Sequence, residues 1–278
     1  MKSLADQVAI ITGAGTGIGR ATALEFGRQG VKTVLIGRRS QPIEAVAHAI
    51  EVEGGSSIAF AADIAEPDAF ERILAVALRH FGRVDIVMNN AVAISTGLPE
   101  DIPYEEWQRV MDINFFSVVR SNKVFLPILI DQGHGHLVNT ASVDGLYGFG
   151  YDRLPYASSK AALVHLSEGL AHYLRPKGIG VTCLCPGPVE SEIATQLKSF
   201  GRPHDVHGPG KQLSLISSED VGHLVVEAVR RNRFMVYTHH EGIHEIVVRR
   251  AQDTDAFLAS QIANPEIIFR WGGDIPVS

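Results

Sequence analysis

The stretch Val8-Ala9-Ile10-Ile11-Thr12-Gly13-Ala14-Gly15-Thr16-Gly17-Ile18-Gly19 decides the fold, because a short apolar run leads directly into a glycine-rich turn. Glycine permits a tight turn and a close approach of the backbone to a ligand. A helical pattern begins at Ile18, so the turn lies between a strand and a helix, where exposed amides and the positive helix end favour a pyrophosphate. A strict Gly-x-Gly-x-x-Gly match is absent, and glycines also cluster in purely structural turns, so the motif alone is weak.

The rest of the chain alternates short apolar runs with longer helical patterns, which indicates βαβ units and a parallel sheet. Strands are predicted at Val8–Ile11, Thr33–Ile36, Ser57–Ala61, Val84–Met88, His136–Asn139, Gly180–Leu184 and Phe234–Thr238. Helices are predicted at Ile18–Gln29, Pro42–Glu53, Phe70–Phe81, Tyr104–Leu129, Pro155–Leu174 and Ser218–Arg231. The fold class is therefore α/β, a doubly wound parallel sheet of the Rossmann type in three α/β/α layers.

The length of 278 residues and the hydrophobic content of 45% suit one large domain, 1–278, better than two small ones. Glycine and proline gather in 200–210, which indicates a mobile loop, and we expect a substrate lid around 191–215. A C-terminal extension, 251–278, reads as helical up to Ala263. It is expected to close the pocket or to cover a subunit contact.

The charge balance argues against nucleic-acid and membrane partners. The net charge is −6, and basic residues form only short pairs such as Arg38 and Arg39. No apolar run reaches the roughly 20 residues of a membrane span, and no secretory pattern precedes the first strand, so a soluble cytoplasmic protein is expected. Cys183 and Cys185 are expected to be buried free thiols on opposite faces of one strand rather than a disulfide or metal site.

Tyr156 and Lys160 are the strongest candidates for chemistry. They are four residues apart, so on a helix the phenol and the ammonium lie on one face. A neighbouring lysine favours the phenolate and lowers the tyrosine pKa toward neutral pH. Taken singly, a tyrosine is usually a packing residue, and a serine such as Ser142 often only ends a strand.

Histidines invite a metal interpretation at His204 with His207, and at His239 with His240 and His244. Neither group has the spacing of a zinc motif. Solvated or loop histidines are therefore expected, and no metal is assigned.

The chain resembles the short-chain dehydrogenase/reductase family over roughly residues 5 to 240. The resemblance rests on several motifs that stand in the family's order along the chain. They are the glycines at 13, 17 and 19, Asp63-Ile64, Asn89-Asn90-Ala91, Asn114, Ser142, Tyr156 with Lys160, and Pro186-Gly187. Together and in this order they make the packing interpretations of single residues untenable.

The resemblance implies a role for each matched residue. Tyr156 exchanges the proton with the carbonyl or alcohol oxygen, Ser142 positions that oxygen, Lys160 also binds the nicotinamide ribose, and Asn114 holds a water against Lys160. The implied cofactor-binding residues are Gly13, Gly15, Thr16, Gly17, Ile18, Gly19, Arg38, Arg39, Asp63, Ile64, Asn90, Ala91, Val92, Tyr156, Lys160, Pro186, Gly187, Val189 and Ser191.

Two positions depart from the family's pattern. Val92 replaces its usual glycine and adds bulk beside the ribose, while Ser191 replaces its usual threonine and keeps the hydroxyl.

The end of the second strand predicts the nicotinamide cofactor. An acidic residue there would bind the ribose 2′-hydroxyl, whereas arginine pairs with a 2′-phosphate. The chain has Gly37, Arg38 and Arg39, which favours NADP(H), with NAD(H) open if both arginines are merely solvated.

The loop between Ser142 and Tyr156 is one residue longer than the family's commonest spacing and is rich in apolar side chains. An apolar substrate wall is expected from Val92, Ile94, Leu98, Val143, Leu146, Tyr147, Phe149, Tyr151 and Leu154, unless the loop residues pack on the core. The function expected is hydride transfer between NADP(H) and a bulky apolar or aromatic secondary alcohol or ketone.

Two other functions stay open, a nucleotide-sugar epimerase or dehydratase and a non-catalytic regulator that senses NAD(P). The resemblance also implies a homotetramer, or else a dimer, in which Tyr104–Leu129 and Pro155–Leu174 pack on symmetry mates.

Overall fold

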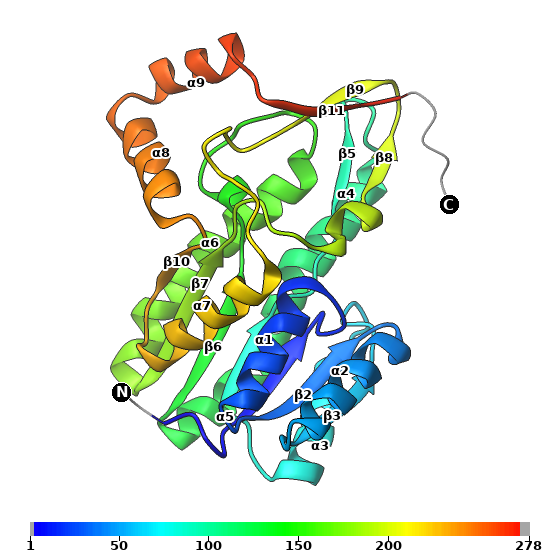
Figure 1. Ribbon diagram of the computed structural model, residues 1–278, viewed down its shortest axis with the longest axis vertical. Coiled ribbons are helices and arrows are strands. Elements are labelled where there is room, and N and C mark those ends of the chain that lie inside the picture. Colours follow the sequence, from blue (N-terminus) through cyan, green and yellow to red (C-terminus); the bar gives the residue numbers. More distant parts are fainter. Residues whose placement is uncertain (1–2, 273–278) are drawn as a thin grey trace.

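The computed structural model describes residues 3–272 and contains a seven-stranded parallel sheet between two helical layers (Figure 1). The strands are β1 Val8–Thr12, β2 Lys32–Gly37, β3 Ser57–Ala61, β4 Ile86–Asn89, β6 Gly135–Thr140, β7 Ile179–Cys185 and β10 Met235–Tyr237. Their order is β10-β7-β6-β4-β1-β2-β3. The order reverses between β1 and β4, which confirms the doubly wound class and opens a crevice at the carboxyl ends of these strands.

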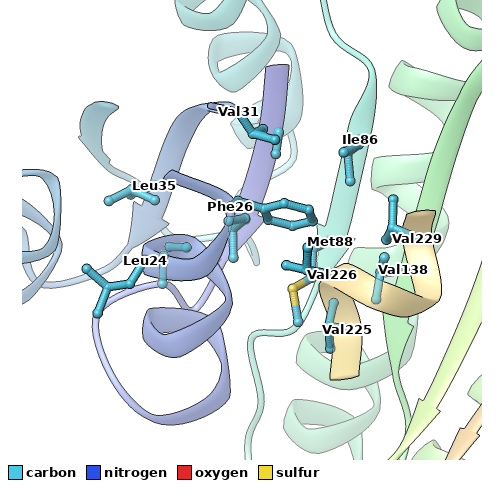
Figure 2. Close-up of a cluster of buried hydrophobic side chains, with 14 of the residues drawn as sticks. Leu24, Phe26, Val31, Leu35, Ile86, Met88, Val138, Val225, Val226 and Val229 are labelled. Carbon is cyan, nitrogen blue, oxygen red and sulfur yellow. The ribbon is translucent and has the colours of Figure 1, made fainter. Parts of the chain in front are cut away.

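The helices cover the two faces through separate apolar clusters. One face carries α1 Gly17–Arg28, α2 Ser40–Val52 and α7 Ser218–Arg230, and the other carries α3 Ala69–Phe81, α5 Ser117–Gln132 and α6 Leu154–Leu174. Phe26 of α1 is fully buried on the first face and points toward Met88 and Val226 (Figure 2). At Gly222 of α7 a Cβ would stand 2.8 Å from the Ala21 backbone, so glycine is what lets α7 approach α1 closely.

The predicted helix Tyr104–Leu129 is one continuous helical segment with a change of geometry inside it. It runs through α4 Tyr104–Met111, the π-helical turn η1 Asp112–Phe116 and α5. By length and composition alone, Tyr104–Gln132 is apolar enough to cross a membrane, contrary to the expectation from the sequence. In its most apolar stretch of 18 residues, 39% is buried inside the protein. A core helix passes the same test, and this segment packs against α3, α6 and the sheet.

Several elements beyond the sheet were not predicted. The expected mobile loop 200–210 contains β9 His204–His207, which pairs antiparallel with β11 Ile267–Trp271, and β5 Ser95–Gly97 pairs with β8 Lys198–Phe200. α8 His240–Gln252 and α9 Thr254–Ala263 lie at the same end of the molecule (Figure 1). These short strands pair with partners far along the chain, so no local pattern marks them. Among these elements only α9 was expected, as the helical part of the extension up to Ala263.

The expectation of solvated or loop histidines was wrong for two of the five positions, His204 and His207. Both are buried in β9, whereas His240 and His244 lie on α8 and are exposed to solvent, as expected. Within residues 3–272, no three His, Cys, Asp or Glu side chains are grouped so as to hold a metal ion.

The expected geometry of the two cysteines was also wrong. Both are buried and free, but their sulfurs are 3.8 Å apart. Residues two apart on a strand share one face, so the expectation of opposite faces misapplied the strand period.

Candidate active site

One cavity of about 940 Å³ lies at the carboxyl ends of the central strands. It brings together most of the site residues predicted from the sequence. Lining it are Gly13, Gly15, Thr16, Gly17, Ile18, Arg38, Arg39, Asp63, Ile64, Asn90, Ala91, Val92, Ser142, Tyr156, Lys160, Pro186, Gly187, Val189 and Ser191. Gly19 and Asn114 are not part of its lining, but Gly19 packs against Gly13 and Asn114 hydrogen-bonds Ala93, and both of these partners line it.

The glycine turn is shaped to present backbone amides to this cavity. Gly13 and Gly17 have φ angles of 66° and 51°, a region that side chains rarely adopt. Thr16 precedes α1 without a side-chain capping hydrogen bond, and the first turn of α1 has no acidic residue. The positive end of α1 is therefore available to an anionic group such as a pyrophosphate.

Asn90 joins three strands beneath the turn. Its side-chain amide donates to the carbonyls of Thr12 and Gly13 at 3.1 and 3.4 Å, and its Oδ1 accepts from Thr140 Oγ1 at 3.2 Å. The Thr12 hydroxyl in turn accepts from the amides of Asn90 and Ala91. The polar side chains of Thr12 and Asn90 thus fix the ends of β1, β4 and β6 relative to one another.

Arg38 and Arg39 lie exposed at the end of β2, and Asp63 lies beyond β3 in the same cavity. Among the described residues, no carboxylate forms an ion pair with either arginine. Both guanidinium groups are therefore free to meet an anionic ligand.

Ser142, Tyr156 and Lys160 meet at the inner end of the cavity. The Ser142 hydroxyl lies close enough to the Tyr156 phenol to favour its ionised form, and Lys160 Nζ lies 5.6 Å from the centre of the tyrosine ring. Lys160 is 2% exposed and donates to the Thr140 carbonyl at 2.6 Å. The α6 helix holds both groups on one face, as the four-residue spacing predicts.

Burial dominates the proton affinities of Tyr156 and Lys160. Burial raises the pKa of Tyr156 to about 12, although the Ser142 hydroxyl acts in the opposite direction, and burial lowers the pKa of Lys160 to about 8. The expected lowering of the tyrosine pKa by the lysine was therefore wrong, because desolvation of the phenol has the largest effect on this pKa. Tyr156 is therefore a neutral phenol near pH 7.

Asn114 lies in the π-helical turn η1 and is 1% exposed. Its side chain accepts from the Ala93 amide at 2.7 Å and donates to the Ala93 carbonyl and to Ser159 Oγ, both at 2.9 Å. It therefore fastens the segment after β4 to helix α6, one residue from Lys160.

The substrate end of the cavity differs from the expected one. Loop residues 143–154 do not line the described cavity, and neither does Leu98. Val143, Tyr147 and Phe149 pack instead with Leu213, Ile243, Ile246 and Phe257. The apolar side chains of this loop therefore pack inside the protein and do not form a substrate wall. Helices α8 and α9 provide the apolar surface that they pack against, and the sequence pattern did not predict this contact.

The walls that do face the cavity there come from three segments. Apolar surface is provided by Val92, Ile94, Ile113, Ile193 and Leu197, and charge by Arg109 and Lys198. Arg109 makes two hydrogen bonds to the buried Glu106 carboxylate, at 2.8 and 2.6 Å, which offsets its charge. Nothing in the local sequence around Arg109 or Lys198 marks either as a cavity residue.

Known proteins resemble this chain over most of its length. A family model described as short chain dehydrogenase matches residues 7–200. A protein of Staphylococcus aureus strain USA300, described as an uncharacterized oxidoreductase, is 28% identical over 90% of this chain and 99% of its own. A 3-oxoacyl-[acyl-carrier-protein] reductase of Synechocystis is 30% identical over 75% of this chain and 89% of its own.

A solved structure shows the same likeness in three dimensions. A short-chain dehydrogenase/reductase from Burkholderia phymatum, in complex with NAD, superposes with a TM-score of 0.80 at 28% identity. The match covers 92% of this chain and 96% of that one.

Proposed function

Because this chain belongs to the short-chain dehydrogenase/reductase family and is an oxidoreductase of CH–OH or keto groups, we propose that it transfers hydride between NADP(H) and a bulky secondary alcohol or ketone. The observation that carries the proposal is one continuous cavity that joins the two sets of residues. It is lined at one end by the glycine turn and at the other by Ser142, Tyr156 and Lys160.

The residues present fit a dinucleotide. The open amides at the start of α1 suit the pyrophosphate, and Gly13, Gly15 and Gly17 line the cavity there without side chains. Arg38 and Arg39 would hold the 2′-phosphate, and Lys160 the nicotinamide ribose. When bound, this cofactor supplies or accepts the hydride.

The chain's own residues would then handle the proton. In reduction Tyr156 donates its phenolic proton to the carbonyl oxygen as negative charge develops there. Ser142 hydrogen-bonds the same oxygen and keeps it beside the phenol. Lys160 stabilises the phenolate that results, and Asn114 fixes the helix that carries both groups.

The cavity walls support an apolar or aromatic substrate. Val92, Ile94 and Leu197 leave room for a hydrophobic body. We propose that the segment 191–215 is the lid over that body, because it contributes Ile193, Leu197 and Lys198 to the wall.

The proposed assembly is a homotetramer or a dimer of single-domain subunits in the cytoplasm. Tyr104 and Phe116 on the α4–α5 segment and Tyr173 on α6 are 71%, 49% and 52% exposed, and they supply apolar surface for packing on a symmetry mate. The free thiols Cys183 and Cys185 fit a reducing compartment. Light scattering on the purified protein measures the subunit number.

The test is a screen of alcohols and ketones with NADPH and NADH, including a 3-oxoacyl thioester because one relative carries that activity in its name. We expect turnover of bulky apolar substrates with NADPH, and a loss of most turnover in Tyr156→Phe with cofactor binding nearly intact. Normal activity in that variant would refute the role of Tyr156. Absence of turnover with both coenzymes would instead favour a regulator that only binds the cofactor.

A further inference from the structure

A buried charged cluster lies beside the loop 143–155, and the proposed mechanism does not use it. The cluster consists of Asp144, Asp152 and Arg153 from this loop and His207 from β9. Asp144, Asp152 and His207 are 8%, 0% and 5% exposed, and the Arg153 side chain is 17% exposed. Four ionisable side chains buried together are costly unless their charges are matched.

Arg153 is the group that matches the charges. Its Nε lies 3.6 Å from Asp144 Oδ2 and 3.2 Å from Asp152 Oδ2, and its guanidinium also donates to the His207 carbonyl. Among the described residues these two carboxylate oxygens and this Nε have no hydrogen-bond partner, so they depend on charge pairing. Removal of the guanidinium would leave two carboxylates buried without a cation.

Asp152 connects the loop to two other segments. Its Oδ1 accepts from the His207 amide at 3.2 Å and lies 2.7 Å from His207 Nδ1, and its carbonyl accepts from the Gly97 amide in β5 at 2.7 Å. Strand β9, which carries His207, is itself paired with β11 of the C-terminal extension. The cluster therefore fastens both the lid region and the extension to the loop.

Asp144 connects the cluster to the reacting groups. Its amide donates to Ser142 Oγ at 3.1 Å, and its charge raises the pKa of Tyr156, whereas the charge of Arg153 lowers it. Burial raises the pKa of Asp144 itself to about 7, against the opposing effect of Arg153. Three charged or titratable groups affect the pKa of Asp144 or Tyr156 besides these two residues themselves: Arg153, Asp152 and Cys185. The neutral Ser142 hydroxyl also affects the pKa of Tyr156. Other titratable groups around the cluster are Tyr147, Lys160, His207 and Glu266.

We propose that Arg153 is a positioning residue of this enzyme: it anchors β9 to the loop that carries Ser142 and neutralises the carboxylates of Asp144 and Asp152 next to Tyr156. The inference rests on the proposed role of Tyr156. It predicts that the cluster acts on the reaction through charge as well as through packing.

The test compares Asp144→Asn with Arg153→Gln, which remove opposite charges. The pH dependence of kcat/KM for alcohol oxidation reports the group that accepts the proton. We expect its apparent pKa to fall by roughly 0.5 to 1 unit in Asp144→Asn and to rise by a similar amount in Arg153→Gln. Arg153→Lys keeps the charge and is expected to restore the wild-type value. A purely structural role would lower activity in both variants without opposite shifts.

Arg202→Gln is the matched control. Arg202 precedes β9 by two residues, is 60% exposed and pairs with Glu100 and Asp101 at the surface. Its replacement is expected to leave the pH profile unchanged. Hydrogen exchange of the amides at 204–207 is expected to accelerate in Arg153→Gln and not in this control.

Two results would overturn the proposal: shifts of the same sign in Asp144→Asn and Arg153→Gln, or an unchanged profile in either variant. If Arg153→Gln does not fold, Asp144→Asn must still lower the apparent pKa, and an unchanged value there is decisive. If the wild-type protein turns over no substrate, the proposed function fails separately. The phenol of Tyr156 can then be titrated by absorbance in the cofactor-free protein, where Asp144→Asn must again lower its pKa.

Discussion

Replacing Gly19 by alanine should distort the pyrophosphate turn from behind. A Cβ at this position would stand 2.3 Å from the Gly13 carbonyl oxygen, 2.6 Å from the Asn90 side-chain nitrogen and 2.9 Å from the Gly13 carbonyl carbon. Two of these three atoms belong to the backbone, which cannot rotate away as the end of a side chain does. Gly13 and Asn90 both line the cavity, so the displacement reaches the cofactor site.

Overpacking of this kind costs about 1–3 kcal/mol, and the gain in helix propensity offsets less than about 1 kcal/mol of it. For a chain of this size we expect Tm to fall by roughly 2–8 °C in calorimetry. The Kd for NADPH, measured by fluorescence titration, should rise as well, because the turn no longer presents its amides correctly. The effect on Kd separates a distorted site from a general loss of stability.

Gly169→Ala is the matched control, because it makes the same substitution in a helix without a clash. Gly169 lies exposed in α6, and a Cβ there meets nothing within 4 Å. It should raise stability by about 0.5–1 kcal/mol and leave the NADPH Kd unchanged. If Gly19→Ala proves as stable and as tight for NADPH as Gly169→Ala, the close packing under the turn is wrong.

Three further changes test other parts of the site and core. The double variant Arg38→Ala, Arg39→Ala removes two exposed cations, each of which attracts a phosphate by about 1 kcal/mol in water. The value of kcat/KM should therefore fall roughly 5- to 30-fold with NADPH and little with NADH. Arg20→Gln on α1 is the control, and equal losses with both coenzymes would contradict the assignment of the two arginines to the 2′-phosphate. Burial raises the pKa of Tyr156 to about 12. A difference absorbance titration of the wild type against Tyr156→Phe, without cofactor, should therefore show no phenolate from this residue below pH 10. A phenolate signal at pH 8 would refute the desolvation argument. Phe26→Ala empties a fully buried position and should lower the free energy of unfolding by about 3–5 kcal/mol in urea denaturation; a cost below about 1 kcal/mol would mean that the core collapses around the gap.

The sequence by itself determined the sheet, the glycine turn between β1 and α1, and the placement of Tyr156 beside Lys160. Each of these features depends on residues that are close together in the sequence. They are apolar runs of strand length, glycines between a strand and a helix, and two polar side chains one helical turn apart. The predicted central strands all occur in the structure within a few residues of their expected bounds, and Tyr156 and Lys160 share one face of α6. Local patterns suffice because the backbone period alone decides which side chains lie together.

Only the tertiary structure decided which distant segments pair and how strongly each group is desolvated. The pairing of β9 with β11, the burial of His207 beside Asp152 and the packing of Tyr147 on Phe257 each join residues more than 50 positions apart. The same holds for Tyr156, whose pKa rises through burial although the adjacent lysine predicts a fall. A periodic pattern predicts that a side chain is buried, but it does not predict which distant side chain it contacts. Desolvation depends on all the neighbours that folding brings around a group, so it cannot be predicted from a local pattern either.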